Sequence, residues 1–205
     1  MTLYFIILIV SIICHELGHL LMALFWKVKV HACSFGFGKV LLHKKWKNID
    51  WRISLIPLGG YCDIEENLNK PNSLYSISYW KQLTIILAGV SVNFLIAFIC
   101  YLINYHSIKT GLIIDWLLLK SFVIKDYSIL LFLSSTNINL FLLQCGFINI
   151  TLAIGNLIMI PPLDGGLLWL ILLKEKISAK IYKIINIIGL ILVILIQVII
   201  LMYIF

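Results

Sequence analysis

The first 26 residues form an apolar stretch that is long enough to cross a bilayer, and it contains the run His15-Glu16-Leu17-Gly18-His19. An ionisable side chain in hydrocarbon costs about 2.5–3.5 kcal/mol on insertion scales. A carboxylate flanked by two imidazoles therefore needs a compensating interaction here. Coordination of a metal ion provides one, and a buried structural cluster of polar groups is the alternative.

Composition indicates a membrane protein. Of the 205 residues, 62% are hydrophobic and only 12% are charged, which is typical of polytopic membrane proteins. The net charge of +7 comes largely from Lys and Arg gathered in two short loops. This distribution favours control of topology over nucleic-acid binding. The five cysteines lack metal-site spacing and are expected to be packing residues.

Four stretches of one domain, residues 1–205, are predicted to span the membrane. They are residues 3–26, 82–104, 139–173 with an internal break, and 184–205. The first has no basic n-region and no evident small-residue cleavage site, and it carries the candidate ligands, so it is expected to be a retained span rather than a signal peptide. Residues 105–138 are predicted as an extracytoplasmic loop that lies partly in the interface or is a plain connection.

The distribution of positive charge predicts the orientation. Residues 27–81 hold nine Lys or Arg against four Asp or Glu, and a second basic cluster precedes the last span. The positive-inside rule places both on the cytoplasmic side, and the two crossings between them agree with this. Both termini are then expected to face outward.

Residues 27–81 carry the pattern of strands rather than that of a helix. Apolar and polar side chains alternate from Trp51 to Leu55. The run 35–38 is predicted to be a turn, and the Pro-Gly-containing run 57–60 is predicted to end the second strand. We expect a small membrane-associated β-region on the cytoplasmic side, and residues 64–80 are predicted to form a surface helix that leads into the second span.

The spacing of the motif indicates how the metal is held. Residues four apart lie on one face of a helix, so His15 and His19 can grip one ion. Glu16 points roughly 100° round the axis. It is better placed to act as the general base for a water molecule than to complete the coordination.

A catalytic zinc site usually takes three protein ligands. Asp164 is the strongest candidate for the third, because it is the only acidic residue in the uncharged stretch 127–173. Prolines and glycines around it permit an unwound segment that presents its carboxylate inside the protein. The alternative is a helix cap at the membrane edge.

Together these residues resemble the site-2 proteases, which are intramembrane zinc metalloproteases, and in particular their compact sporulation-type branch without PDZ or CBS domains. Residues 15–19 look like the first motif of the family, and residues 156–166 look like its second. The run 87–94 is similar to the Ala-Gly-Pro-x-x-Asn signature, although Val90 stands in place of proline. Met159 likewise stands where many members have proline.

The resemblance implies an α-helical polytopic membrane protein with a three-helix catalytic core and one Zn²⁺ on His15, His19 and Asp164. It implies peptide hydrolysis within or near the span of a membrane-tethered protein or signal peptide. Candidates for contacts with the substrate or the oxyanion are Asn93, Asn156 and Asn149. Each of these could equally join spans to one another.

Two other functions stay open from the sequence. One is a catalytically inactive membrane protein that binds client helices or a metal, although a base beside the ligands has no use in a binder. The other is a membrane protease that takes its third ligand from a later Glu. Only Glu65, Glu66 and Glu175 are available, all in basic loops. The expected partners are a membrane-spanning substrate and the lipid bilayer, not nucleic acid.

Overall fold

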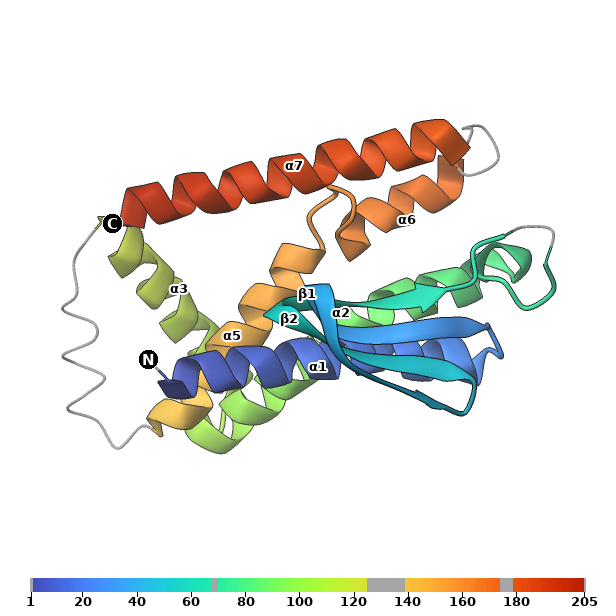
Figure 1. Ribbon diagram of the computed structural model, residues 1–205. Coiled ribbons are helices and arrows are strands. Elements are labelled where there is room, and N and C mark those ends of the chain that lie inside the picture. The colour runs from blue at the N-terminus through green and yellow to red at the C-terminus, as the bar shows by residue number, and fades with distance from the viewer. Residues whose placement is uncertain (1, 68–69, 125–138, 174–178, 205) are drawn as a thin grey trace.

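The computed structural model describes residues 2–67, 70–124, 139–173 and 179–204 (Figure 1). Helix α1 covers Thr2–Phe25, and strands β1 (Val30–Trp46) and β2 (Ile49–Ile64) follow it. Helices α2 (Tyr79–Tyr105) and α3 (Ile108–Ile124) come next. The remaining helices are α5 (Leu140–Asn156), α6 (Asp164–Leu173) and α7 (Ala179–Ile204).

Helices α1, α2 and α5 pack together, and the sheet lies over the C-terminal half of α1 (Figure 1). Leu20 and Ala23 of α1 meet Cys33 of β1 and Ile85 of α2 in a buried cluster. A second cluster joins α2 to α5 through Tyr101. The polar end of α1 is thus enclosed by a helix on one side and by a sheet on another.

Two described helices are long and apolar enough to cross a bilayer, namely Leu3–Phe25 and Tyr79–Tyr105. They match the first two predicted spans. The third predicted span is two shorter apolar helices, α5 and α6, separated by a turn that contains a cis peptide bond between Pro161 and Pro162. The predicted break is therefore present.

The sheet is a long hairpin that bends back on itself. Residues 32–35 of β1 pair with residues 60–63 of β2 on one side and with residues 50–53 on the other. The hairpin turn is at Lys47 and Asn48, which both have positive φ. This backbone conformation suits a two-residue hairpin turn.

Two predictions for this region are wrong. Residues 35–38 are not a turn but part of β1, where Gly36 and Gly38 have φ of +98° and +82°. Such glycines permit irregular pairing inside a strand, which bends it without ending it. Residues 57–60 do not end β2 either, because the strand continues to Ile64 across a shift in register.

The connections also differ from expectation. Among the described residues of 64–80, the helical structure before α2 is only the short 3₁₀ helix Leu74–Ser76. Part of the predicted loop 105–138 is helix α3. Its charged residues are accommodated because Asp115 is buried and accepts a hydrogen bond from Tyr101, while Lys109 and Lys120 stay exposed. Residues 125–138 lie outside the described part of the chain.

Helix α7 lies along the molecule beside α6 (Figure 1). Close to its start, the hydroxyl of Tyr182 lies 3.3 Å from that of Tyr75. Further along, Gly189 packs directly against the backbone of Pro161. These contacts join the last helix to the loop before α2 and to the turn before α6.

Candidate metal centre

Three side chains from two distant parts of the chain converge at the centre of the helices. The Oδ2 atom of Asp164 lies 3.1 Å from Nε2 of His15 and 3.3 Å from Nε2 of His19. The two Nε2 atoms are 3.1 Å apart. All three residues are buried. The structure therefore brings together the three residues that the sequence suggested as ligands.

These distances fit a metal ion. Two nitrogen or oxygen ligands bound at about 2.1 Å to a tetrahedral zinc ion lie about 3.4 Å apart. The Nδ1 atom of His19 lies 2.8 Å from the carbonyl oxygen of Ile85. Because a carbonyl can only accept, Nδ1 carries the proton and Nε2 presents its lone pair to the centre. A cation bound between the three side chains would be held by the lone pairs of neutral imidazoles and of the carboxylate.

The neighbouring helix leaves room for the two histidines because it has a glycine beside them. A Cβ atom at Gly89 would collide with both imidazole rings. At Gly18, a Cβ atom would lie 2.9 Å from the carbonyl oxygen of Ala88, so α1 and α2 approach closely on this face. Helix α2 thus supplies both the space for the rings and the carbonyl of Ile85 that orients one of them.

Asp164 is the first residue of α6. The turn before it folds back tightly, since a side chain at Gly165 or Gly166 would collide with the backbone of Leu157 or Pro161. This turn carries the carboxylate to the level of the histidines. The Pro-Pro and Gly-Gly pairs therefore serve the geometry that the sequence suggested for them.

Glu16 is also buried, with 8% of its surface exposed. Its side chain packs against the backbone of β2, where a Cβ atom at Gly60 would lie 2.7 Å from Cγ of Glu16. The thiol of Cys62 donates a hydrogen bond to the carbonyl oxygen of Glu16 at 3.3 Å. The carboxylate is thus enclosed between α1 and the sheet.

The three asparagines differ in their surroundings. Asn93 is fully buried, and neither of its amide atoms has a hydrogen-bond partner. Asn149 is also fully buried, but its Nδ2 atom donates to Oγ of Ser11 and to the carbonyl of Cys145, both at 2.9 Å. Asn156 is half-buried at the end of α5.

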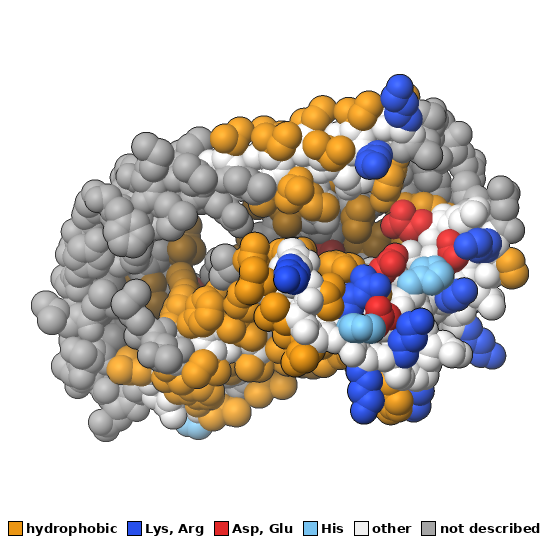
Figure 2. Space-filling model, in the orientation of Figure 1, with side chains coloured by type: hydrophobic (Ala, Val, Ile, Leu, Met, Phe, Trp, Pro, Cys, Tyr) orange, Lys and Arg blue, Asp and Glu red, His pale blue; other side chains and the backbone are white. Residues whose placement is uncertain are grey.

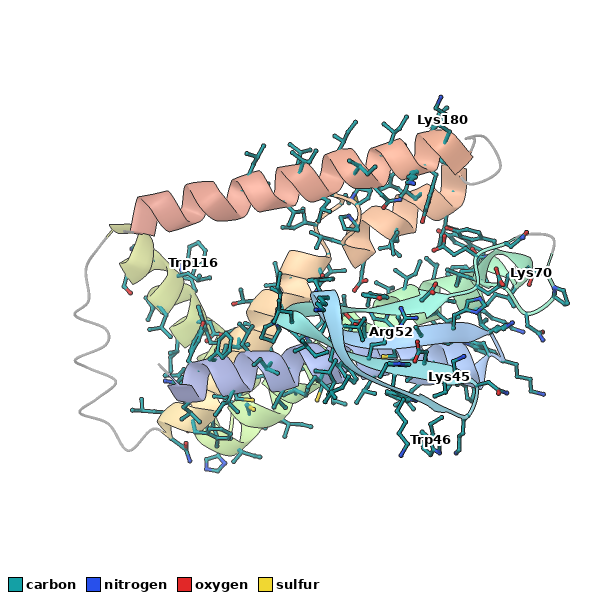
Figure 3. All side chains as sticks on the ribbon, viewed as in Figure 1. Lys45, Trp46, Arg52, Lys70, Trp116 and Lys180 are labelled. Atoms are coloured by element: carbon teal, nitrogen blue, oxygen red, sulfur yellow. The ribbon has the colours of Figure 1, made fainter. Side chains whose placement is uncertain are left out.

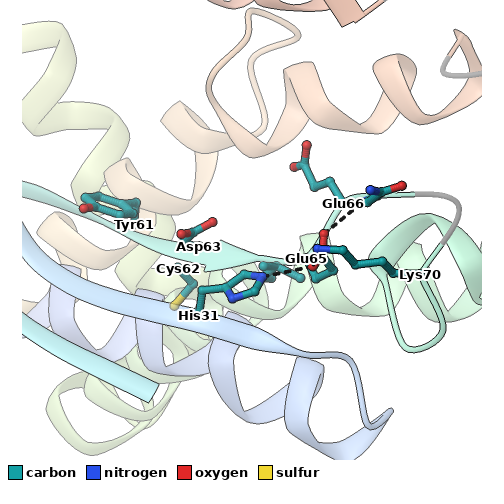
Figure 4. A pocket seen from close by; sticks show the side chains of 9 residues that line it. His31, Tyr61, Cys62, Asp63, Glu65, Glu66 and Lys70 are labelled. Atoms are coloured by element: carbon teal, nitrogen blue, oxygen red, sulfur yellow. Dashed lines mark hydrogen bonds and ion pairs between the residues drawn. The ribbon is translucent and has the colours of Figure 1, made fainter. Parts of the chain in front are cut away.

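Glu65 and Glu66 lie apart from this centre, in the loop after β2. They line a cavity of about 530 Å³ together with His31 and Lys70 (Figure 4). The Oε2 atom of Glu65 is 2.7 Å from Nζ of Lys70 and 3.2 Å from Nε2 of His31. The hydrogen bond from Lys70 lowers the pKa of Glu65 to about 2. Glu65 is therefore occupied by an ion pair and not by the metal group.

Sequence reasoning missed three residues of this site. Gly60 and Cys62 stand beside Glu16, and Ile85 offers its carbonyl to His19. A carbonyl acceptor leaves no trace in the sequence. The alternation of strand residues would have placed Gly60 and Cys62 on one face, but the strand was predicted to end at residue 60.

Comparison with known proteins identifies the class. The model of the family described as Peptidase family M50 matches residues 3–196, so the chain belongs to this family, the site-2 protease family. The resemblance seen in the sequence motifs is confirmed. The family is embedded in the membrane, in agreement with the two long apolar helices.

Several relatives carry the name "Putative zinc metalloprotease". The one from Campylobacter jejuni is 40% identical over 109 residues, which are 47% of this chain and 29% of that protein. The one from Treponema pallidum is 35% identical over 106 residues, 45% of this chain and 24% of that protein. The chain thus matches less than a third of the length of these relatives.

Proposed function

We propose that the chain is an intramembrane zinc metalloprotease that hydrolyses peptide bonds within or near the transmembrane segment of a membrane-tethered protein or signal peptide. The observation that supports this most is the convergence of His15, His19 and Asp164 in a buried group, with the next residue in the helix, Glu16, enclosed beside it. Family membership supports the same reaction.

His15, His19 and Asp164 would hold the zinc ion and leave a fourth position for water. When bound, zinc polarises the scissile carbonyl and lowers the pKa of water. The hydrogen bond from His19 to Ile85 keeps one ligand atom directed at the centre. The close packing of α2 at Gly89 then fixes both rings.

Glu16 would act as the general base. Its carboxylate takes the proton of the attacking water and then delivers a proton to the leaving amine. A base must stand within hydrogen-bond reach of that water, directly beside the ligands but outside the coordination sphere. Its position one residue after His15 supports this role, since the two side chains leave the helix about 100° apart.

Asn93 is the best of the three asparagines for a contact with the substrate backbone or the developing oxyanion. A fully buried amide without a partner is costly, so it favours a role in which another group supplies the hydrogen bonds. It lies one helical turn beyond Gly89 on α2. Asn149 has its amide nitrogen engaged within the protein and Asn156 is half-buried, so we rank both lower.

The edge of the sheet would bind the substrate in extended form. Residues 60–64 pair with β1 on one side, and no strand among the described residues pairs with the other. That edge runs past Glu16 and faces α6 and α7 (Figure 1). A helical substrate must unwind before its peptide bond can be attacked, and pairing with a free strand edge stabilises the unwound segment.

We keep the predicted four spans and the cytoplasmic position of the β-region as part of this proposal. Charged side chains support the shared position of the two basic clusters. Lys45, Arg52 and Lys70 of the sheet and its loop lie at the same end of the molecule as Lys180 of α7 (Figure 3). Carboxylates, lysines and histidines gather over the sheet, whereas the helices present apolar side chains (Figure 2).

The experiment is cleavage of a panel of membrane-spanning peptides, each with a fluorophore and a quencher, by the purified full chain loaded with zinc. We expect wild type to cleave at least one peptide and Glu16→Gln to retain full zinc while losing cleavage by about 100-fold or more. Wild-type rates in Glu16→Gln, or no cleaved peptide at all, would contradict the proposed function. Binding of the peptides without cleavage would instead favour a catalytically inactive binder.

A further inference from the structure

Gly60 brings the backbone of β2 into direct contact with the side chain of Glu16. A Cβ atom at position 60 would lie 2.7 Å from Cγ of Glu16 and 2.8 Å from the carbonyl oxygen of Ser34. Any residue other than glycine would therefore have to displace the carboxylate, the neighbouring strand or both. The strand packs on the part of the Glu16 side chain that sets where its carboxylate points.

Cys62 forms a second contact from the same face of the strand, since residues two apart point the same way. Figure 4 shows its side chain directed away from those of Tyr61 and Asp63. Its Sγ atom donates to the carbonyl oxygen of Glu16 at 3.3 Å and lies 3.3 Å from Sγ of Cys33. Because Cys62 has one hydrogen to give, Cys33 is the donor in the thiol pair.

The Cys62 thiol stays protonated under ordinary conditions. The contact with Cys33, followed by burial and the nearby carboxylate of Glu16, raises the pKa of Cys62 well above its usual range. The thiol is therefore a lasting donor toward Glu16, and its raised pKa makes it a poor nucleophile.

From these contacts we propose that Gly60 and Cys62 are positioning residues for the catalytic carboxylate, so that the strand whose free edge receives the substrate also holds the general base. The proposal rests on the role of Glu16 proposed above. A glutamate side chain has several rotamers, and a misplacement of about 1 Å at a reacting group can cost 100-fold in rate. The two contacts restrict Glu16 at its backbone carbonyl and at its Cγ.

This arrangement has a consequence for the reaction. An extended substrate on the edge of residues 60–64 would lie on the strand that contacts Glu16, with no intervening element. Placement of the scissile bond and placement of the base would then depend on the same segment. Disturbing the segment should lower kcat, whereas weakening a binding surface alone should raise KM.

The first test replaces Cys62, with the peptide that wild type cleaves fastest as the probe. Cys62→Ala removes the donor, and we expect kcat to fall about tenfold with KM and zinc content unchanged, the lower range for loss of a supporting hydrogen bond. Cys62→Ser keeps a donor and should recover kcat to within about threefold of wild type. Cys33→Ala is the matched control, because Cys33 shares the buried site but does not touch Glu16, and it should cleave like wild type.

Equal kcat in Cys62→Ala and wild type would overturn the role of Cys62. An equal fall in Cys62→Ala and Cys33→Ala would overturn it too, since that pattern reports loss of packing. If Glu16→Gln is inactive while the Cys62 variants cleave normally, the positioning proposal fails and the proposed function stands. If Glu16→Gln is fully active, the proposed function fails as well.

The second test is Gly60→Ala, with Gly155→Ala as its control. A Cβ atom at Gly155 meets nothing within 4 Å, so this control adds the same methyl group at a harmless place. We expect kcat of Gly60→Ala to fall by about 100-fold while one zinc per chain remains. Retained kcat would refute the contact's role. If Gly60→Ala loses its zinc, the methyl group has disturbed the fold, and the Cys62 series decides.

Discussion

Buried polar side chains have different arrangements in the helical core and in the sheet. In the core, His15, His19 and Asp164 come from two helices, are all buried, and bring one ligand atom each to within 4.8 Å of one another. In the sheet, the buried side chains of Ser34 and Ser54 satisfy each other through hydroxyls 3.1 Å apart. Buried ligand atoms that converge indicate a binding site for a metal ion, whereas paired hydroxyls indicate a structural role.

The two regions also share a feature that separates them from water-soluble domains. Both carry apolar side chains outward, with Leu21 65% exposed on α1 and Leu55 57% exposed on β2. In the core this follows from helices enclosed by lipid. In the sheet, the outward apolar side chains mean that polar positions of a strand can face inward. This is the reverse of the pattern expected for a strand in a water-soluble domain. The regions meet at Gly60, where the sheet touches Glu16.

Removing one of the three proposed zinc ligands should produce the largest effect. Asp164→Ala leaves two imidazoles and should weaken zinc binding by more than about 100-fold, because the loss of supporting groups alone costs 10–100-fold. The measurement is zinc per chain by elemental analysis after dialysis against a chelator. Asp115→Asn, which alters another buried carboxylate, should keep its zinc. One zinc per chain in Asp164→Ala would show that Asp164 is not a ligand, although its side chain converges with the two histidines.

A substitution that crowds the imidazole rings of His15 and His19 should have the second-largest effect. Gly89→Ala places a methyl group against both imidazoles, so we expect zinc affinity to fall about 10- to 100-fold, within the range for groups that orient ligands. Alanine is otherwise favoured over glycine in helices by about 1 kcal/mol. Gly155→Ala serves as the control in a competition titration with a chelator. Unchanged affinity would mean that α2 does not fix the rings.

Much of the core could be predicted from sequence because each step had a local signal. The period of the helix places His15 and His19 on one face, and Asp164 stands alone in an uncharged stretch. The prolines and glycines on either side of Asp164 predict the break in the helix. Family resemblance then joined these motifs. What the sequence could not give is the carbonyl of Ile85, since every residue carries the same backbone acceptor.

The sheet was predicted less well for a physical reason. Glycine and proline usually mark turns, but Gly36 and Gly38 adopt positive φ within a strand and bend it. Alternation indicated the strand at residues 51–55, but it did not indicate which face is buried. Helix α3 was missed because its charges suggested a loop, although Asp115 is paired with Tyr101. Pairing of this kind depends on a distant helix.

Loss of one hydrogen bond between two helices should have a smaller effect. It can be compared with loss of a hydrogen bond within a single helix of the core. Oγ of Ser11 accepts from Nδ2 of Asn149 at 2.9 Å and joins α1 to α5. Ser11→Ala should lower the free energy of unfolding by about 0.5–1.5 kcal/mol. Reversible unfolding in mixed micelles measures it. Ser91→Ala is the control, because Ser91 bonds only the carbonyl of Leu87 in its own helix, and it should change little.

The smallest effect is expected from an ion pair of the β-region, because the lysine of the pair is exposed to water, which screens its charge. Lys70 lowers the pKa of Glu65 to about 2 from an ordinary value of 4.5. A lowered pKa stabilises the fold above the unfolded value, and that contribution is lost as pH falls from about 4.5 to 2. Glu65→Gln should therefore unfold at a slightly lower temperature than wild type at pH 6, and the gap should close toward pH 2. A gap that is independent of pH would show that Glu65 acts through packing, as the apolar side chains of the core do, and not through its charge.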